Sequence, residues 1–163
     1  MKVLRHAVQE REKKALLARY LAEYGYALSD ELKRGEKVEV HKTELGTLYL
    51  LGQQPLVFET DGGLRPTLLF QRHIAQLPRI VVDQGAIPYI CRGADVMKPG
   101  VRRVDGRFQR GALVAVVDER FGKPIALGNS LLSSEEILSA QRGRVVKVFH
   151  FAGDKLWKLL KTL

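Results

Sequence analysis

The segment from Arg79 to Val104 constrains the fold of this chain most, because a strand, a turn, a short helix and a glycine-rich loop must follow one another there. The β-branched run Arg79–Val82 predicts the strand. Asp83 is placed to cap the helix, and Gly93 to end it. Pro88 fits only the first turn of that helix, so the first helical residue stays open by one or two positions. The segment predicts a strand-to-helix turn followed by an exposed loop.

Glycines and cations gather in this same segment. Glycine has no Cβ, so its backbone can turn sharply and approach a ligand closely. Positive charge beside such a backbone is typical of sites that hold phosphate groups. The residues predicted to contact a phosphate-bearing polyanion here are Gly85, Arg92, Gly93, Lys98, Gly100, Arg102, Arg103 and Arg110. Each glycine alone also fits an ordinary turn or helix end, and only the grouping with cations favours a binding site.

The basic charge of the chain lies mainly in its second half. Residues 1–78 hold 12 Lys and Arg against 10 Asp and Glu, whereas residues 79–163 hold 15 against 8. A local excess of this kind favours a polyanion partner, most often nucleic acid, although a merely solvated basic surface gives the same count.

Composition places the chain among globular proteins, with 45% hydrophobic and 28% charged residues. No apolar run approaches the roughly 20 residues that a membrane span needs, so we expect no membrane partner. The N-terminus has no apolar stretch typical of a signal peptide, and a single cysteine agrees with a reducing compartment. We therefore expect the protein in the cytoplasm.

The first half is predicted to combine helices with a small antiparallel sheet. Residues 6–24 carry apolar side chains at helical spacing, and Gly25 is a suitable stop. The runs KVEVHK, GTLYLLG and PLVFET are separated by turn signals and predict a meander. In the first of these runs, alternation predicts Val38 and Val40 inside and His41 outside.

Residues 66–77 predict a second helix that ends before Pro78. The next strand follows almost at once, without a flexible linker. We therefore predict an N-terminal α+β domain over residues 1–77 and a second domain over residues 78–163, packed rigidly on one another.

The second half is rich in strands. GALVAVV is apolar on both faces and predicts a central strand, with KPIALGNSLL as its partner. In that partner, Gly128 lets another backbone or a ligand come close. Ser133 and Glu136 form a capping box, so a short helix begins there and is expected to stop near Gly143. RVVKVFHF follows as another strand, whereas DKLWKLL fits a strand or a helix. This pattern predicts a small β-barrel within an α+β protein.

The sequence carries no pattern of a catalytic or metal centre. The phosphate-loop, dinucleotide, HExxH and CxxC patterns are absent, and no histidine has a second ligand at metal spacing. Cys91 is expected to be an inert buried thiol and His150 a structural residue. Asp95 is expected to order its loop by accepting nearby backbone amides. We therefore expect no catalytic residue, no metal and no cofactor.

Three segments of the sequence resemble those of a known protein family. VDQGAIPYICRGADVMKPGV resembles the opening of the PUA domain, the small RNA-binding module named after pseudouridine synthases and archaeosine transglycosylases. PTLLFQRHIAQLP and LLSSEEILSAQRGRVVKVFHFAGDKLW are similar to the malignant-T-cell-amplified-sequence proteins and their archaeal relatives. The similarity runs from Pro66 to Trp157. It implies a PUA-type β-pseudobarrel after the N-terminal domain, and a strand at DKLWKLL.

The resemblance also extends the predicted surface. In PUA domains the late strand often lies beside the helix and loop at the nucleic-acid groove, so Arg142, Arg144 and Lys147 are added to the predicted RNA-binding residues. A solvated strand edge protected by cations would have the same sequence.

The function that the resemblance implies is non-catalytic binding of structured RNA, either tRNA or small-subunit rRNA, in translation initiation or recycling. The implied partners are that RNA, the small ribosomal subunit and a translation-factor-like protein. An accessory RNA-binding subunit of a pseudouridine- or archaeosine-type RNA-modifying enzyme is the main alternative. A protein-interaction module, and a hydrolase or transferase using Cys91 or a histidine, are further alternatives. The sequence leaves the identity of the RNA and the oligomeric state open.

Overall fold

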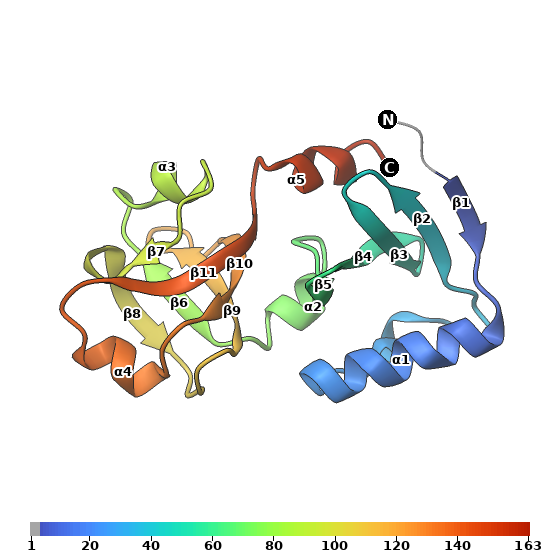
Figure 1. Cartoon of the computed structure of the whole chain (residues 1–163), viewed down its shortest axis with the longest axis horizontal. Helices are drawn as coiled ribbons and strands as arrows, with labels where there is room; N and C mark the ends of the chain where they lie inside the picture. Colours follow the sequence, from blue (N-terminus) through green and yellow to red (C-terminus); the bar gives the residue numbers. More distant parts are fainter. Residues whose placement is uncertain (1–3) are drawn as a thin grey trace. The chain divides into compact units, whose positions relative to one another are not determined.

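The structure, a computed structural model, describes residues 4–163. The chain divides into two compact units, Met1–His73 and Ile74–Leu163 (Figure 1). Each unit combines helices with mostly antiparallel strands, which confirms the predicted α+β class. The boundary between residues 77 and 78, and rigid packing of the two domains, stay predictions.

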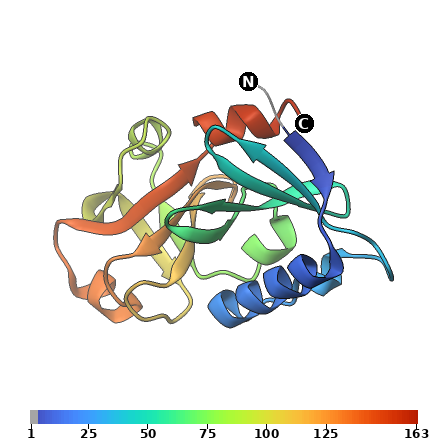
Figure 2. The same cartoon turned by 45° about the vertical axis from the view of Figure 1, so that its right-hand side comes forward.

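The first unit is a five-stranded antiparallel sheet with one long helix against one face (Figure 1 and Figure 2). Its strands follow the order β1-β2-β3-β4-β5, so each pairs with its neighbour in sequence and the predicted meander is confirmed. The elements are β1 (Leu4–Ala7), α1 (Glu10–Tyr24), the 3-10 helix η1 (Leu28–Glu31), β2 (Glu39–Thr43), β3 (Gly46–Leu51), β4 (Gln54–Thr60), β5 (Gly63–Pro66) and α2 (Gln71–Ile74).

The core of this unit contains a buried histidine among aromatic rings. The ring of His73 lies against those of Tyr20, Tyr26 and Phe70. Its Nδ1 is hydrogen-bonded to the Tyr20 hydroxyl at 2.8 Å, and burial lowers the pKa of His73 to about 4. The imidazole is therefore neutral near pH 7 and acts as a hydrogen-bonded core residue.

Both predicted helices of this unit are shorter than expected. The helix expected from residue 6 begins at Glu10, because Leu4–Ala7 form a strand paired with β2. The helix expected over residues 66–77 is reduced to Gln71–Ile74, because Thr67 still bonds strand β4: its amide donates to Leu56 O at 2.9 Å and its hydroxyl to Pro55 O at 2.8 Å. Pairing with distant strands outweighs local helical spacing in both places.

The predicted outward orientation of His41 is wrong. His41 is 3% exposed, and Val40 beside it is 4% exposed, so both faces of β2 are buried. Within residues 4–163 neither ring nitrogen of His41 has a hydrogen-bond partner, and burial lowers its pKa. Alternation in sequence marks two faces but does not say that one of them is solvated.

The second unit is a six-stranded sheet that curls into a pseudobarrel, as predicted. The strand order is β7-β11-β10-β9-β6-β8, which puts β7 and β8 at opposite edges. Those two strands are joined by a single 3-10 turn, so the sheet must curl until its edges meet there. The elements are β6 (Arg79–Val82), α3 (Ile87–Ile90), β7 (Val96–Met97), η2 (Lys98–Gly100), β8 (Val101–Asp105), β9 (Leu113–Asp118), β10 (Pro124–Ser130), α4 (Ser134–Ser139), β11 (Arg144–Phe151) and α5 (Lys155–Leu160).

The central strand of this sheet lies where the sequence predicts it. All six residues of β9 are buried, between antiparallel β10 and parallel β6. In β10, a Cβ added to Gly128 would lie 2.5 Å from the carbonyl oxygen of Lys147. Gly128 is therefore required by the close approach of β11, the first of the two possibilities that the sequence leaves open.

The structure contradicts the prediction for the last segment of the chain. DKLWKLL forms helix α5, not the strand that the resemblance implies. Asp154 starts this helix, since its Oδ1 accepts the amide of Trp157 at 2.7 Å, and its Oδ2 accepts that of Phe151 at 2.8 Å. An N-terminal aspartate followed by Leu156, Leu159 and Leu160 is a helical signal, because those leucines share one buried face.

Candidate nucleic-acid interface

The segment around Asp83 forms the predicted strand-turn-helix. Asp83 orders the turn before α3, because its Oδ1 accepts the amide of Ala86 at 2.8 Å. The predicted cap of the helix by Asp83 is wrong, since Ala86 directly precedes α3 and no side chain of residues 4–163 caps it. The Asp83 amide donates to Gly100 O at 2.9 Å, which ties the start of α3 to the end of the loop. Pro88 lies in the first turn of α3, where its missing amide breaks no helical bond.

The three glycines of this segment are not equivalent. Gly93 has a φ of +101°, a conformation that favours glycine strongly. A Cβ on Gly100 would lie 3.0 Å from that of Ala86, so this loop residue must be small. A Cβ on Gly85 would meet only Asp83 Oδ1 at an ordinary 3.5 Å, so the folded chain gives Gly85 no structural need for glycine.

Lys98, the lysine of the loop, has its ammonium group hydrogen-bonded to the end of a helix. Its Nζ donates to the carbonyl oxygens of Ile137 at 2.8 Å, Ala140 at 2.7 Å and Leu138 at 3.4 Å. These are carbonyls at the C-terminus of α4, where the helix leaves acceptors without intrahelical partners. All three ammonium protons are thereby committed, and the side chain joins the β7–β8 connection to α4.

Arg102 and Arg103, which we name the β8 edge, are both exposed and both face acids. Arg103 makes a two-pronged contact with Asp105, Nε to Oδ1 at 2.7 Å and Nη2 to Oδ2 at 3.1 Å. This bond raises the pKa of Arg103 and lowers that of Asp105. Arg102 lies 3.3 Å from Glu119 and 3.9 Å from Asp83. The positive charge of the β8 edge is thus largely offset by its own neighbours.

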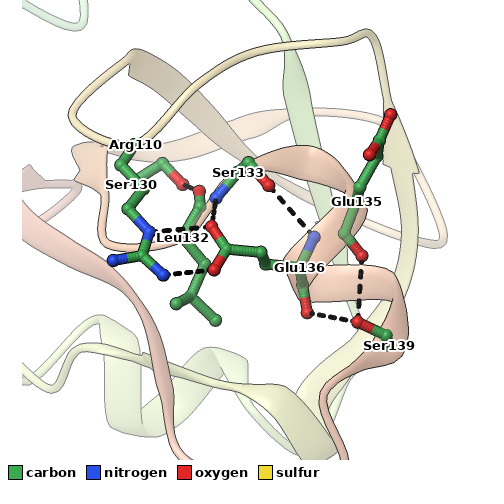
Figure 3. Close-up of polar contacts among 7 residues, drawn as sticks. All are labelled: Arg110, Ser130, Leu132, Ser133, Glu135, Glu136 and Ser139. Atoms are coloured by element: carbon green, nitrogen blue, oxygen red, sulfur yellow. Dashed lines mark hydrogen bonds and ion pairs between the residues drawn. The ribbon is translucent and has the colours of Figure 1, made fainter.

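Arg110 is part of the capping box of α4 (Figure 3). Its Nε donates to Glu136 Oε1 at 2.8 Å and its Nη2 donates to Oε2. Glu136 also accepts the amide of Ser133 at 3.0 Å, while its own amide donates to the Ser133 hydroxyl at 3.1 Å. The bond to Arg110, followed by that to the Ser133 amide, lowers the pKa of Glu136 to about 2. The predicted capping box is confirmed, and Arg110 forms an ion pair with it.

A different arrangement exists where β7 pairs with β11. A bulge in β11 turns Val145 and Val146 both inward, and this leaves Arg144 and Lys147 both exposed. Arg144 lies 3.3 Å from Asp95, whose other oxygen accepts the amide of Val148 at 2.9 Å. Asp95 therefore ties its loop to β11, an amide 53 residues away, instead of ordering the loop through nearby amides.

Three further cations near this pairing are exposed and have no side-chain partner within residues 4–163. They are Arg92, Arg142 and Lys147. Arg92 follows α3 in the loop that leads to β7, and Gly143 beside Arg142 accepts the amide of Lys98 at 2.8 Å. Two exposed apolar side chains join them, Tyr89 on α3 at 66% and Met97 on β7 at 48%. We name these residues, with Arg144, the β7–β11 surface.

Tyr89 and Met97 are members that the sequence reasoning missed. Both lie inside the segment from Arg79 to Val104, whose glycines and cations alone predict the site. The available signal was an aromatic residue on a helix too short to bury more than one side; Ile90 takes that buried side.

The described part of the chain shows no second candidate site. Burial raises the pKa of the half-buried Cys91 thiol, which disfavours a thiolate nucleophile. His150 is buried, as expected, with its Nδ1 bonded to Asp154 Oδ2 at 2.8 Å. Among residues 4–163 no group of His, Cys, Asp and Glu could hold a metal ion, and no helix is long and apolar enough to cross a membrane.

Comparison with known proteins agrees with this architecture. Residues 78–152 match the model of the PUA domain, and residues 4–73 match a domain of unknown function, DUF1947. The uncharacterized protein MJ1432 of Methanocaldococcus jannaschii is 36% identical over 126 residues, which are 77% of this chain and 77% of that protein.

Two further relatives cover nearly the whole chain. Translation machinery-associated protein 20 of Saccharomyces cerevisiae is 26% identical over 156 residues, 91% of this chain and 86% of that protein. The crystal structure of a PUA domain from Aeropyrum pernix K1, a tartrate complex, has a TM-score of 0.85 at 27% identity and covers 98% of this chain and 92% of that one. The chain therefore belongs to the PUA-domain family of translation-associated proteins in archaea and eukaryotes, the family of the malignant-T-cell-amplified-sequence proteins.

Proposed function

We propose that this chain is a non-catalytic RNA-binding protein of the translation machinery and that its β7–β11 surface contacts the RNA. One observation supports this most: Arg92, Arg142 and Lys147 are exposed without an acidic partner in the described chain. Exposed cations without a partner attract a polyanion, whereas cations that already face carboxylates do so weakly.

The cations would supply affinity without sequence preference. Each lysine or arginine that meets a phosphate releases condensed counterions, so binding weakens as salt rises, by a log-log slope of about 0.7 to 0.9 per contact. Arg144 would add to this only in part, because Asp95 lies 3.3 Å from it.

Recognition of unpaired nucleotides would come from the two apolar residues of the β7–β11 surface. Tyr89 presents an exposed ring on which a base can stack, and Met97 presents an exposed polarizable side chain. Gly93 keeps the backbone between them open to sugar and base edges. An RNA with a stem and an unpaired end, such as tRNA or a small-subunit rRNA element, fits this combination.

The relatives support a cellular context for the proposal. A protein named for its association with the translation machinery matches 91% of this chain, so we place the chain in the cytoplasm, with the small ribosomal subunit and a translation factor as partners. The accessory-subunit alternative would differ by co-purification with an RNA-modifying enzyme.

Titration of a tRNA and a small-subunit rRNA fragment at several salt concentrations tests the proposal. The key variant is Arg92→Ala/Arg142→Ala/Lys147→Ala. We expect it to bind at least about tenfold more weakly and to have a salt slope shallower by about two to three.

A matched control removes the same charge elsewhere. Arg11→Ala/Lys14→Ala/Arg34→Ala deletes three exposed cations of the first unit, and its salt slope should stay that of the wild type. If the two triple variants bind alike, the interface lies elsewhere. If the wild type binds neither RNA, the proposed function is wrong.

A further inference from the structure

The hairpin turn between β9 and β10 exposes a phenylalanine. Phe121 is 76% exposed, more than any other large hydrophobic side chain of residues 4–163. Burying such a ring is worth far more than leaving it in water, so its position in a short turn calls for a reason.

The turn is held firmly by a buried carboxylate. Asp118 is 5% exposed; its Oδ1 accepts the amide of Phe121 at 2.5 Å and its Oδ2 that of Lys123 at 3.1 Å. From the neighbouring strand, Arg79 Nη2 donates to Gly122 O at 3.2 Å. The backbone is thus fixed in the position that presents the ring to solvent.

The surroundings of the ring are cationic. The guanidinium of Arg120 lies over the ring, 5.2 Å from its centre, and Lys123 is exposed two residues away. Two acids belong to the turn. Asp118 is buried against its backbone amides, and Glu119 is engaged by Arg102 at 3.3 Å and by the amide of Gln84 at 3.3 Å. An aromatic ring between cations is the arrangement that binds single-stranded nucleic acid, with bases on the ring and phosphates on the cations.

We infer that Phe121 stacks against an unpaired base of the bound RNA while Arg120 and Lys123 contact the adjoining phosphates. This inference rests on the proposed function and assigns it a second contact point. A protein partner fits less well, because a docking site needs several contiguous apolar side chains, and within residues 4–163 no other large hydrophobic side chain of the turn is exposed.

The position of the turn agrees with a single bound strand. The Glu119 amide donates to Val82 O at 3.0 Å, so the turn adjoins the start of the α3 segment. Arg92, a member of the β7–β11 surface, follows the far end of α3 along the chain. An unpaired RNA tail that runs along α3 would meet both.

The test compares two RNAs that differ only in bases. Both carry the same stem and the same unpaired tail, but one tail is abasic, so the phosphates are retained. The wild type should bind the normal tail about fivefold or more tightly than the abasic one, and Phe121→Ala should lose most of that preference. Phe121→Trp should keep it. Arg120→Ala/Lys123→Ala should flatten the salt slope by about one to two and keep part of the preference.

The outcomes separate this inference from the proposed function. Loss of the base preference in Phe121→Ala, with thermal unfolding like that of the wild type, supports the stacking contact. An unchanged preference in that variant overturns the contact while RNA binding itself stands, and it points to a protein at Phe121 instead. Absence of any base preference in the wild type also overturns it. If the wild type binds no RNA, both proposals are wrong.

Discussion

The β8 edge and the β7–β11 surface lie at opposite edges of one sheet, and both are basic in sequence, but their charges are not equally available. Arg103 holds Asp105 at 2.7 Å and Arg102 faces Glu119 at 3.3 Å. Arg92, Arg142 and Lys147, in contrast, face no acid within the described chain.

The difference shows that a count of cations overstates the charge offered to a ligand. An exposed ion pair stabilises the fold by at most about 1 kcal/mol, yet it places a carboxylate where a phosphate would have to come. The first expectation from the sequence centred on the loop and the β8 edge. The availability of charge favours the β7–β11 surface, to which the resemblance had added Arg142, Arg144 and Lys147.

Replacement of Lys98 should have the largest effect on stability. Lys98→Met removes the donor to three carbonyls at the end of α4, and we expect it to lower the free energy of unfolding by about 1 to 3 kcal/mol. Its RNA salt slope should match that of the wild type, because this ammonium contacts helix carbonyls instead of phosphates.

Lys147→Met is the reciprocal control. It deletes an exposed lysine without a partner in the described chain, so the unfolding midpoint in urea should hardly move, while the salt slope should fall by about one. A slope loss in Lys98→Met as large as that in Lys147→Met would contradict the comparison of the two regions.

Removal of a whole ion pair at the β8 edge should have a smaller effect. Arg103→Ala/Asp105→Ala deletes equal and opposite charges, so we expect RNA affinity within about twofold of the wild type and an unchanged salt slope. Filter binding at three salt concentrations measures both. A slope lower by about one would mean that Arg103 exchanges Asp105 for a phosphate on binding.

Freeing Arg110 from its ion pair with Glu136 should have the smallest effect on RNA affinity. In Glu136→Gln the capping box is retained, since glutamine also serves at that position, but the charge facing Arg110 is lost. We expect affinity to rise by no more than about twofold, through net charge alone, as measured by the same titration. A rise of about tenfold with a steeper slope would place Arg110 at the RNA.

Lowering the pH cannot free Arg110 in the way that Glu136→Gln does. Because Arg110 and the Ser133 amide lower the pKa of Glu136 to about 2, its stabilising contribution is fully present above the ordinary value of 4.5 and is lost progressively as the pH falls from there through about 2. In the wild type the Arg110–Glu136 pair should therefore stay intact from pH 8 down to pH 5.

Most of the fold could be predicted from the sequence. The strand Arg79–Val82, the buried β9 and the capping box at Ser133 depend on periodicity and on residues three positions apart, and these are local. The failures had two causes. Pairing with a distant strand overruled a local pattern at Leu4–Ala7, which pairs with β2, and the resemblance implied a strand where Asp154 starts helix α5.

The candidate site could be predicted less completely. The sequence predicts the segment from Arg79 to Val104, the loop conformation at Gly93 and the exposure of the arginines. The segments that resemble the family also predict the membership of the chain in it. The exposed rings of Tyr89 and Phe121 could not be assigned, because which side of a short helix or turn faces the core depends on what packs there.

The sequence by itself determined most of the elements and that the second half carries the basic charge. Only the tertiary structure decided which of those cations stay available, because their partners lie far away along the chain: 26 residues separate Arg110 from Glu136, 39 separate Lys98 from Ile137, and 49 separate Arg144 from Asp95. Ion pairs and caps at such separations depend on how the sheet curls, and no local pattern records them.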